Sequence, residues 1–150
     1  MGILDSIIGK DKPDAVQPKP VQSASYGKSA NPFAVTLSFA PLRLAANKAS
    51  SVNLVVKVKN ISADPHLVSV DALLPRDTML GFDPACINKA IEKRVGELKP
   101  GESRDVQIQI WSNGQTKENS YPLDVTVFAH YIGYNKVLSY IKKNTTLRAV

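Results

Sequence analysis

The fold is decided by residues 94–110, which read Arg-Val-Gly-Glu-Leu-Lys-Pro-Gly-Glu-Ser-Arg-Asp-Val-Gln-Ile-Gln-Ile. Aliphatic residues occupy every second position near its end: Val106, Ile108 and Ile110. Successive side chains of a β-strand point to opposite faces, so this pattern predicts a strand with one buried and one solvent-exposed face. The Pro100-Gly101 pair ahead of it predicts a tight turn, because proline presets one φ angle and glycine accepts the positive φ that follows.

The same two-residue periodicity extends to both sides of this stretch and predicts seven strands. Two of them lie within residues 94–110, and the others cover residues 33–39, 52–58, 66–74, 121–131 and 136–148. Pro41 and Pro75 end the first and third strands, since proline cannot donate a hydrogen bond to a sheet. Short alternating strands separated by turns are typical of two antiparallel sheets packed face to face, so we expect an all-β sandwich.

Residues 75–93 depart from the strand pattern. Asp83-Pro84 has the composition of a helix N-cap followed by proline at the first helical position. Three apolar residues then recur at helical spacing: Ile87, Ala90 and Ile91. The sequence therefore predicts a short helical insert, about Pro84–Lys93, that bridges the two sheets.

Size and composition fit one folded domain with a tail. The chain has 150 residues, 43% of them hydrophobic, and a net charge of +6. Its basic residues are scattered and do not form a stripe with aromatic residues between them, which disfavours nucleic-acid binding. Cys86 is the only cysteine, so an intramolecular disulfide is excluded. No apolar run is long enough to span a bilayer and the N-terminus does not match a signal peptide, so a cytoplasmic location is expected.

The first nine residues, Met-Gly-Ile-Leu-Asp-Ser-Ile-Ile-Gly, form a short amphipathic segment. Its apolar residues would share one face of a helix: Ile3, Leu4, Ile7 and Ile8. A helix of this length is unstable alone in water, so it needs a surface, either a membrane interface or an apolar groove on a partner protein. The alternatives are a frayed terminus or a helix packed on its own domain. Met1-Gly2 followed by Ser6 also matches the N-myristoylation pattern.

Residues 10–31 differ in composition from the segments on either side of them. They hold three prolines and four lysines, and large apolar residues are scarce. Such a segment buries too little apolar surface to offset the entropy lost on ordering, so a flexible linker is predicted. The chain is thus divided into a short amphipathic N-terminal segment, 1–9, a flexible linker, 10–31, and an immunoglobulin-like sandwich domain, 32–150.

Three stretches of the predicted domain carry a resemblance to a known group: Val-Asn-Leu-Val-Val-Lys-Val-Lys-Asn at 52–60, Gly-Glu-Leu-Lys-Pro-Gly-Glu-Ser at 96–103, and Tyr-Pro-Leu-Asp-Val-Thr-Val at 121–127. They resemble the CARDB/NEW3 group of immunoglobulin-like domains, in which a strand ending in Lys-Asn accompanies a Leu-x-Pro-Gly-Glu turn. The resemblance covers residues 33–147 and implies a seven-stranded antiparallel immunoglobulin-like sandwich that binds or adapts without catalysis. The chain departs from the group in the helical insert and in lacking a secretion signal. The resemblance does not indicate which ligand the domain binds.

No set of residues for catalysis, metal binding or cofactor binding stands out. His66 and His130 lack a second ligand at metal-binding spacing, and His130 is expected to be a surface residue beside Tyr131. Cys86 lies in the first turn of the predicted helix, where we expect it to pack as a small hydrophobe. There is no glycine-rich phosphate-binding loop. We therefore expect a protein that is not an enzyme and carries no metal or cofactor.

Large residues that alternation places outward indicate an interaction surface. Phe128 and His130 lie on the outward side of one predicted strand, Trp111 ends another, and Tyr134 follows in the next turn. The first hypothesis is an adaptor or assembly module that contacts a protein partner, or itself in a homo-oligomer, through this surface. The N-terminal segment would then attach to a membrane surface or a second partner. The alternative hypothesis is a carbohydrate- or polymer-binding module with Trp111, Tyr134 and Tyr140 as its platform.

Overall fold

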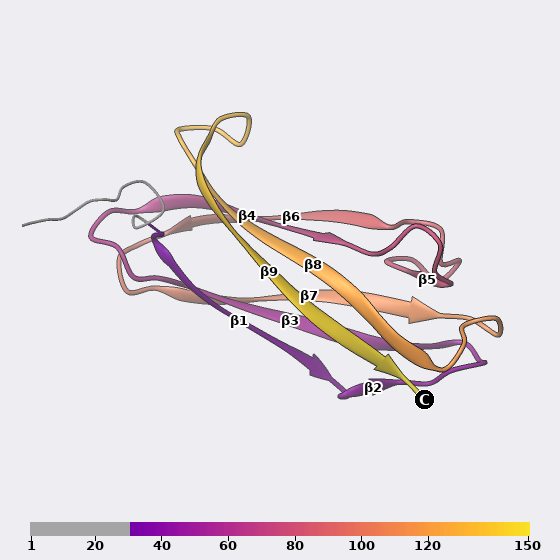
Figure 1. Cartoon of the computed structure of the whole chain (residues 1–150). Helices are drawn as coiled ribbons and strands as arrows, with labels where there is room; N and C mark the ends of the chain where they lie inside the picture. Colours follow the sequence, from indigo (N-terminus) through magenta and orange to yellow (C-terminus); the bar gives the residue numbers. More distant parts are fainter. Residues whose placement is uncertain (1–30) are drawn as a thin grey trace, which may run out of the picture. The chain divides into compact units, whose positions relative to one another are not determined.

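Two β-sheets packed face to face make up residues 31–150, the part of the chain that the computed structural model describes. Sheet A has the strand order β1 (Phe33–Ala40), β3 (Ser50–Asn60), β7 (Ser103–Ser112) and β5 (Leu80–Gly81). Sheet B has the order β2 (Arg43–Leu44), β9 (Val137–Ala149), β8 (Asn119–His130), β4 (His66–Leu73) and β6 (Ala90–Leu98). Figure 1 shows β8 and β9, in orange and yellow, lying across β1, β3 and β7. The predicted segment 1–9 and nearly all of the linker 10–31 lie outside the described residues.

The core lies between the sheets and is built by residues that alternation predicted to be buried. Leu54 of β3 and Ile108 of β7 are completely buried on the sheet A side, and Val70 of β4 and Val127 of β8 on the sheet B side. Burial at every second position of β3 and β8 follows the two-residue period of a strand. The all-β, two-sheet prediction is therefore confirmed.

The strand count differs from the prediction of a seven-stranded antiparallel sandwich. The described residues form nine strands, and the two additional ones, β2 and β5, contain two residues each. β2 follows the cis peptide bond between Ala40 and Pro41, where the chain leaves sheet A and pairs in parallel with β9 at the edge of sheet B. A strand of two residues leaves no alternating pattern in a sequence, so periodicity cannot reveal it.

The helical insert predicted at Pro84–Lys93 is wrong, because no helix occurs among residues 31–150. The Asp83 carboxylate does accept the N–H groups of Ile87 and Asn88, at 2.9 and 2.8 Å, much as a capping residue would. A helix does not follow this cap, because Cys86 adopts a left-handed φ of 58°, which cannot continue a right-handed helix. The chain then enters β6, which pairs with β4 along its length. The described residues likewise contain no helix of the length and apolarity needed to cross a membrane.

The strand end and the turn that carry the family resemblance meet at Asn60, the last residue of β3. Its backbone N–H donates to the Glu102 carbonyl oxygen at 2.9 Å, and its carbonyl oxygen accepts the Gly101 N–H at 2.8 Å. Its buried side-chain amide donates to the carbonyl oxygens of Leu98, at 2.9 Å, and Asp64, at 2.8 Å. Gly101 has a φ of 81°, as the predicted Pro-Gly turn requires. Asn60 therefore ties the end of sheet A to β6 of sheet B.

Candidate interaction face on sheet B

The outer face of sheet B consists of the side chains on β6, β4, β8 and β9 that point away from the core. The register of these strands arranges the side chains in four rows that cross the sheet. Read from β6 to β9, row one is Glu97, Leu67, His130 and Val137, and row two is Arg94, Ser69, Phe128 and Tyr140. Row three is Glu92, Asp71, Thr126 and Lys142, and row four is Ala90, Leu73, Asp124 and Asn144.

Row two supplies the aromatic centre of this face. The rings of Phe128 and Tyr140 lie 6.0 Å apart, measured between their centroids, and Tyr140 remains 64% exposed. The Phe128 ring lies the same 6.0 Å from the His130 ring of row one. Phe128 thus points outward, as alternation predicted, and is half-buried by the rings beside it.

Tyr134 belongs to the loop between β8 and β9 and is held against this face by three contacts. Its hydroxyl accepts a hydrogen bond of 3.0 Å from the Gly96 N–H, at the bulge of β6 where φ is 96°. The Arg94 guanidinium lies 4.7 Å from the centroid of its ring, which is cation–π distance. The His130 ring meets it edge to face at 5.1 Å. The loop between two strands therefore presents a ring whose position is fixed.

His130 and Ser69 form a buried pair on this face. Their Nε2 and Oγ atoms lie 2.7 Å apart, and the residues are 6% and 1% exposed. The other ring nitrogen, Nδ1, lies 3.3 Å from the Lys136 carbonyl oxygen, which can only accept, so Nδ1 carries a proton. A serine beside a histidine is one part of a nucleophilic site, but a hydroxyl this buried does not meet a dissolved substrate. The pair holds the β8–β9 hairpin to β4, and the prediction of His130 as a surface residue is wrong.

Row three carries acidic groups at its β6–β4 end and a basic group at its β9 end. Glu92 and Asp71 are cross-strand neighbours, and Lys142 lies at the far end of the row. One carboxylate oxygen of Asp71 is buried without a hydrogen-bond partner. Burial, and secondly the Glu92 carboxylate, raise the pKa of Asp71, whereas His130 acts in the opposite direction. Lys142 contacts the Asp124 carboxylate at 3.7 Å.

Trp111 does not belong to this face. It lies on β7 of sheet A, pairs with Gly81 of β5 and is half-buried. Its carbonyl oxygen lies 3.4 Å from the Cys86 sulfur, and burial raises the pKa of the Cys86 thiol, which disfavours the reactive thiolate. The predicted platform of Trp111, Tyr134 and Tyr140 is wrong, because Trp111 lies on sheet A, whereas Tyr140 lies on β9 of sheet B and Tyr134 lies in the loop before β9.

The structure brings some of the other predicted contact residues together, and does not describe the rest. Phe128, His130 and Tyr134 come together as the sequence suggested, whereas sequence reasoning missed Arg94 and Ser69. The only signal for Ser69 was its outward position on the predicted strand 66–74, and Arg94 carried none. Four apolar residues lie outside the described part of the chain and stay a prediction: Ile3, Leu4, Ile7 and Ile8.

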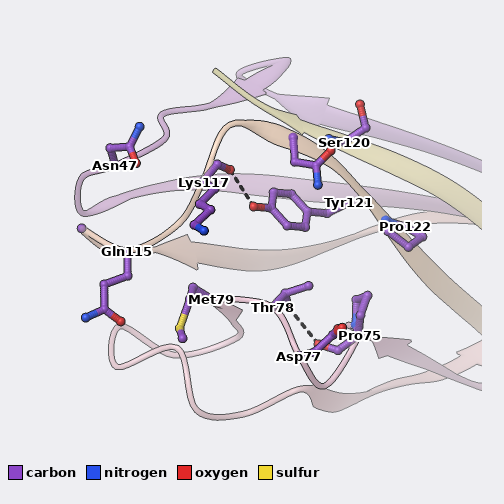
Figure 2. A pocket seen from close by; sticks show the side chains of 12 residues that line it. Asn47, Pro75, Asp77, Thr78, Met79, Gln115, Lys117, Ser120, Tyr121 and Pro122 are labelled. Carbon is purple, nitrogen blue, oxygen red and sulfur yellow. Dashed lines mark hydrogen bonds between the residues drawn. The ribbon is translucent and has the colours of Figure 1, made fainter.

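A groove of about 930 Å³ opens beside the start of β8, among the loops that follow β4 and β7 (Figure 2). The Tyr121 hydroxyl donates to the Lys117 carbonyl oxygen at 2.6 Å, and the Thr78 hydroxyl donates to that of Pro75 at 2.8 Å. Three amide side chains also line the groove: Asn47, Gln115 and Asn119. Within residues 31–150, no three His, Cys, Asp or Glu side chains lie close enough together to hold a metal ion.

Comparison with solved structures finds similar folds at low sequence identity. Alpha-2-macroglobulin of E. coli matches with a TM-score of 0.53 and 16% identity, over 81% of this chain but only 7% of that protein. A FixG-related protein from Vibrio parahaemolyticus matches with a TM-score of 0.49 and 11% identity, over 80% of this chain and 98% of that one. The CARDB domain of a Pyrococcus furiosus protein, in complex with di-metal ions, matches with a TM-score of 0.46 and 18% identity, over 85% and 100%.

These likenesses concern the fold alone. The chain shares its fold with a segment of the macroglobulin, and a CARDB domain is among the structures it resembles. No protein-family model and no curated protein matches the sequence.

Proposed function

We propose that the protein is a non-enzymatic adaptor or assembly module, and that the outer face of sheet B is its protein-binding surface. The observation that carries this proposal is the fixed position of Tyr134, which groups of β6 and β8 hold on three sides. Tyrosine and arginine are the side chains that, with tryptophan, dominate the binding energy of protein interfaces. On this face Tyr134, Tyr140 and Arg94 are grouped around one row.

Preorganisation and apolar area both support this proposal. A ring that is already held loses little conformational freedom on binding, so more of its contact energy appears as affinity. Val137 and Leu138, both exposed at the start of β9, extend the apolar surface beyond Tyr140. Exposed apolar patches rimmed by polar groups commonly mark interfaces.

Site-specific photo-crosslinking in cells that make the protein tests this proposal. A photoreactive phenylalanine derivative in place of Tyr140 or Thr126 is expected to give a discrete adduct with a protein. The matched controls are Gln107 and Gln109, which are exposed on the outer face of sheet A and should give no adduct. If neither sheet B position crosslinks while the protein remains folded, the face is not a binding surface.

The N-terminal segment supplies the second attachment in this proposal. Residues 1–9 would bind a membrane surface or a second protein, with residues 10–31 as the tether. Deleting residues 1–9 should abolish flotation with liposomes and leave the crosslink from Tyr140 unchanged. Flotation that survives the deletion, or that is absent from the full chain, would remove the membrane part of the proposal.

The groove beside Tyr121 favours a second candidate function, the binding of a carbohydrate or another hydroxyl-rich polymer. Amide side chains offer both donors and acceptors to hydroxyl groups, and a concave site with a few convergent polar groups is the usual form of a ligand pocket. Glycan-array binding that Gln115→Ala and Asn119→Ala reduce would support this function. Trp111→Ala is the control, because Trp111 does not line the groove. A blank array would contradict it.

A further inference from the structure

We propose that the outer face of sheet B binds the same face of a second copy of the chain, related to the first by a two-fold axis that runs along the strands. This inference rests on the protein-binding role proposed above for the face, and it names the partner. Sheets that pack face to face keep their strands within about 30° of one another, so the rows of two copies stay opposite each other near the centre of the contact.

The symmetry decides which residues meet. A two-fold axis that lies in the interface, parallel to the strands, exchanges the two sides of the sheet. It places β6 of one copy opposite β9 of the other, and β4 opposite β8, while each row keeps its level along the strands. Every contact then occurs twice, because a two-fold dimer uses the same patch on both subunits.

Row three brings opposite charges together in this arrangement. Glu92 of each copy faces Lys142 of the other, and their side chains are 48% and 53% exposed. Asp71 of each copy faces Thr126 of the other between these two charge pairs. A copy related by this two-fold axis therefore places the basic end of its row three opposite the acidic end of the first.

Row two adds aromatic contacts to the charge pairs. Arg94 faces Tyr140 of the second copy, and both side chains are exposed in the single chain. Because Arg94 already lies against Tyr134 of its own chain, its guanidinium would stand between two tyrosine rings. Arginine stacks on aromatic faces in this way at protein interfaces.

The charge distribution also favours this axis and this partner over the alternatives. An axis perpendicular to the strands would stack β9 on β9. On the outer face β9 carries two basic residues, Lys142 and Arg148, and no acidic residue, so two copies of this strand would then repel each other. A membrane or nucleic-acid surface would meet the carboxylates of Glu92, Asp71 and Asp124 on the same face, and phosphate groups are repelled by them.

Charge reversal tests both the dimer and its axis. Glu92→Lys and Lys142→Glu each create two like-charge pairs in the interface, so each variant alone should raise the dimer dissociation constant about tenfold or more. A mixture of the two variants restores opposite charges in the mixed dimer, and its dissociation constant should return to within about threefold of the wild-type value. Sedimentation velocity of the full-length proteins measures all three, with circular dichroism to show that each variant is folded.

Lys143→Glu is the matched control, because it changes the net charge equally but Lys143 pairs with core-facing Val125 and so lies on the other side of β9. Its dissociation constant should stay within about threefold of wild type. A wild-type chain that is monomeric at every attainable concentration, or a mixture that stays monomeric, would overturn the dimer. The crosslink from Tyr140 separates the two proposals. An adduct with a different protein keeps the binding role and removes the second copy, whereas no adduct removes both.

Discussion

Gly81 lies where the loop that carries Cys86 crosses strand β5. A methyl group at Gly81 would stand 2.4 Å from the Cys86 Cα atom and 2.7 Å from its carbonyl carbon. Backbone atoms cannot swing aside as the end of a flexible side chain does. Gly81→Ala should therefore lower the free energy of unfolding by about 1–3 kcal/mol, the usual effect of overpacking. Urea unfolding followed by circular dichroism measures this change.

Gly114→Ala is the matched control for that substitution. A Cβ atom at Gly114 meets no other atom within 4 Å. Its effect on the free energy of unfolding should stay within about 0.5 kcal/mol. Equal effects of the two substitutions would mean that the Cys86 loop moves aside freely, contrary to the close approach at Gly81.

Asp71 links the stability of the protein to pH. Burial, followed by the Glu92 carboxylate, raises the pKa of Asp71 above its ordinary value, and His130 only partly opposes this. The folded state therefore binds the Asp71 proton more tightly than the unfolded state does. Its contribution to stability is present below the ordinary carboxyl pKa and is lost as the pH rises through the raised pKa.

Asp71→Asn removes this ionisation, so the variant should be more stable than the wild type at neutral pH. The difference should shrink toward zero as the pH falls to the ordinary carboxyl range, because Asp71 is then protonated. Thermal unfolding at one fixed protein concentration, repeated across that pH range, measures the difference. Asp124→Asn is the control and should give no gain, since Asp124 accepts a 2.6 Å hydrogen bond from Asn144. A gain that is the same at every pH would exclude ionisation as its cause.

At the scale of elements, one hydroxyl fastens the β8–β9 loop to strand β6. Tyr134→Phe removes the acceptor of the Gly96 N–H but keeps the ring and its contact with Arg94. The variant should lose about 0.5–1.5 kcal/mol of stability, the usual net value of one hydrogen bond, and the Gly96 amide should exchange its hydrogen faster. Tyr131→Phe, in the same loop but exposed, should change neither quantity. Unchanged exchange in Tyr134→Phe would show that this contact does not hold the loop.

The long strands were predictable because each buries one face, and burial leaves a two-residue period in β3 and β8. The family resemblance also paired the Lys-Asn strand end with the Pro-Gly turn, and the backbone hydrogen bonds of Asn60 with Gly101 and Glu102 explain this pairing. The helix prediction failed because the cap at Asp83 indicates only how the chain turns locally, and not which structure follows it. Pairing of β6 with β4 is decided by residues distant in sequence, which local patterns do not contain.

Contacts between residues distant in sequence also limited what could be predicted of the outer face of sheet B. Phe128 and His130 lie two residues apart on one strand, so their common direction could be predicted from the sequence. The burial of His130 depends on Tyr134 folding back over the sheet, and the position of Arg94 depends on the register of β6 against β4. Neither follows from the spacing of residues along the chain.

At the scale of the whole described domain, β8 separates the groove from the β8–β9 loop. The groove lies beside the start of β8 and the loop follows its end, and β8 contains twelve residues. Row four of the outer face, however, reaches Asp124, two residues along β8 from Pro122 in the lining of the groove. The proposed dimer face and the groove are therefore close neighbours at the start of β8. Glycan binding should be measured both below and above the protein concentration at which the dimer forms.

The two sheets share one core, which predicts that they unfold together. Leu54 of β3 is completely buried in a cluster that also contains Val127 of β8, so Leu54→Ala should lower the free energy of unfolding by about 2–5 kcal/mol. Trp111 is the only tryptophan and lies on β7, so its fluorescence reports on sheet A, whereas circular dichroism reports on every strand. In a two-state transition the two signals coincide in urea, for the wild type and for the variant alike. If the fluorescence of Leu54→Ala changes at lower urea than its circular dichroism, sheet A unfolds by itself and the core does not couple the sheets.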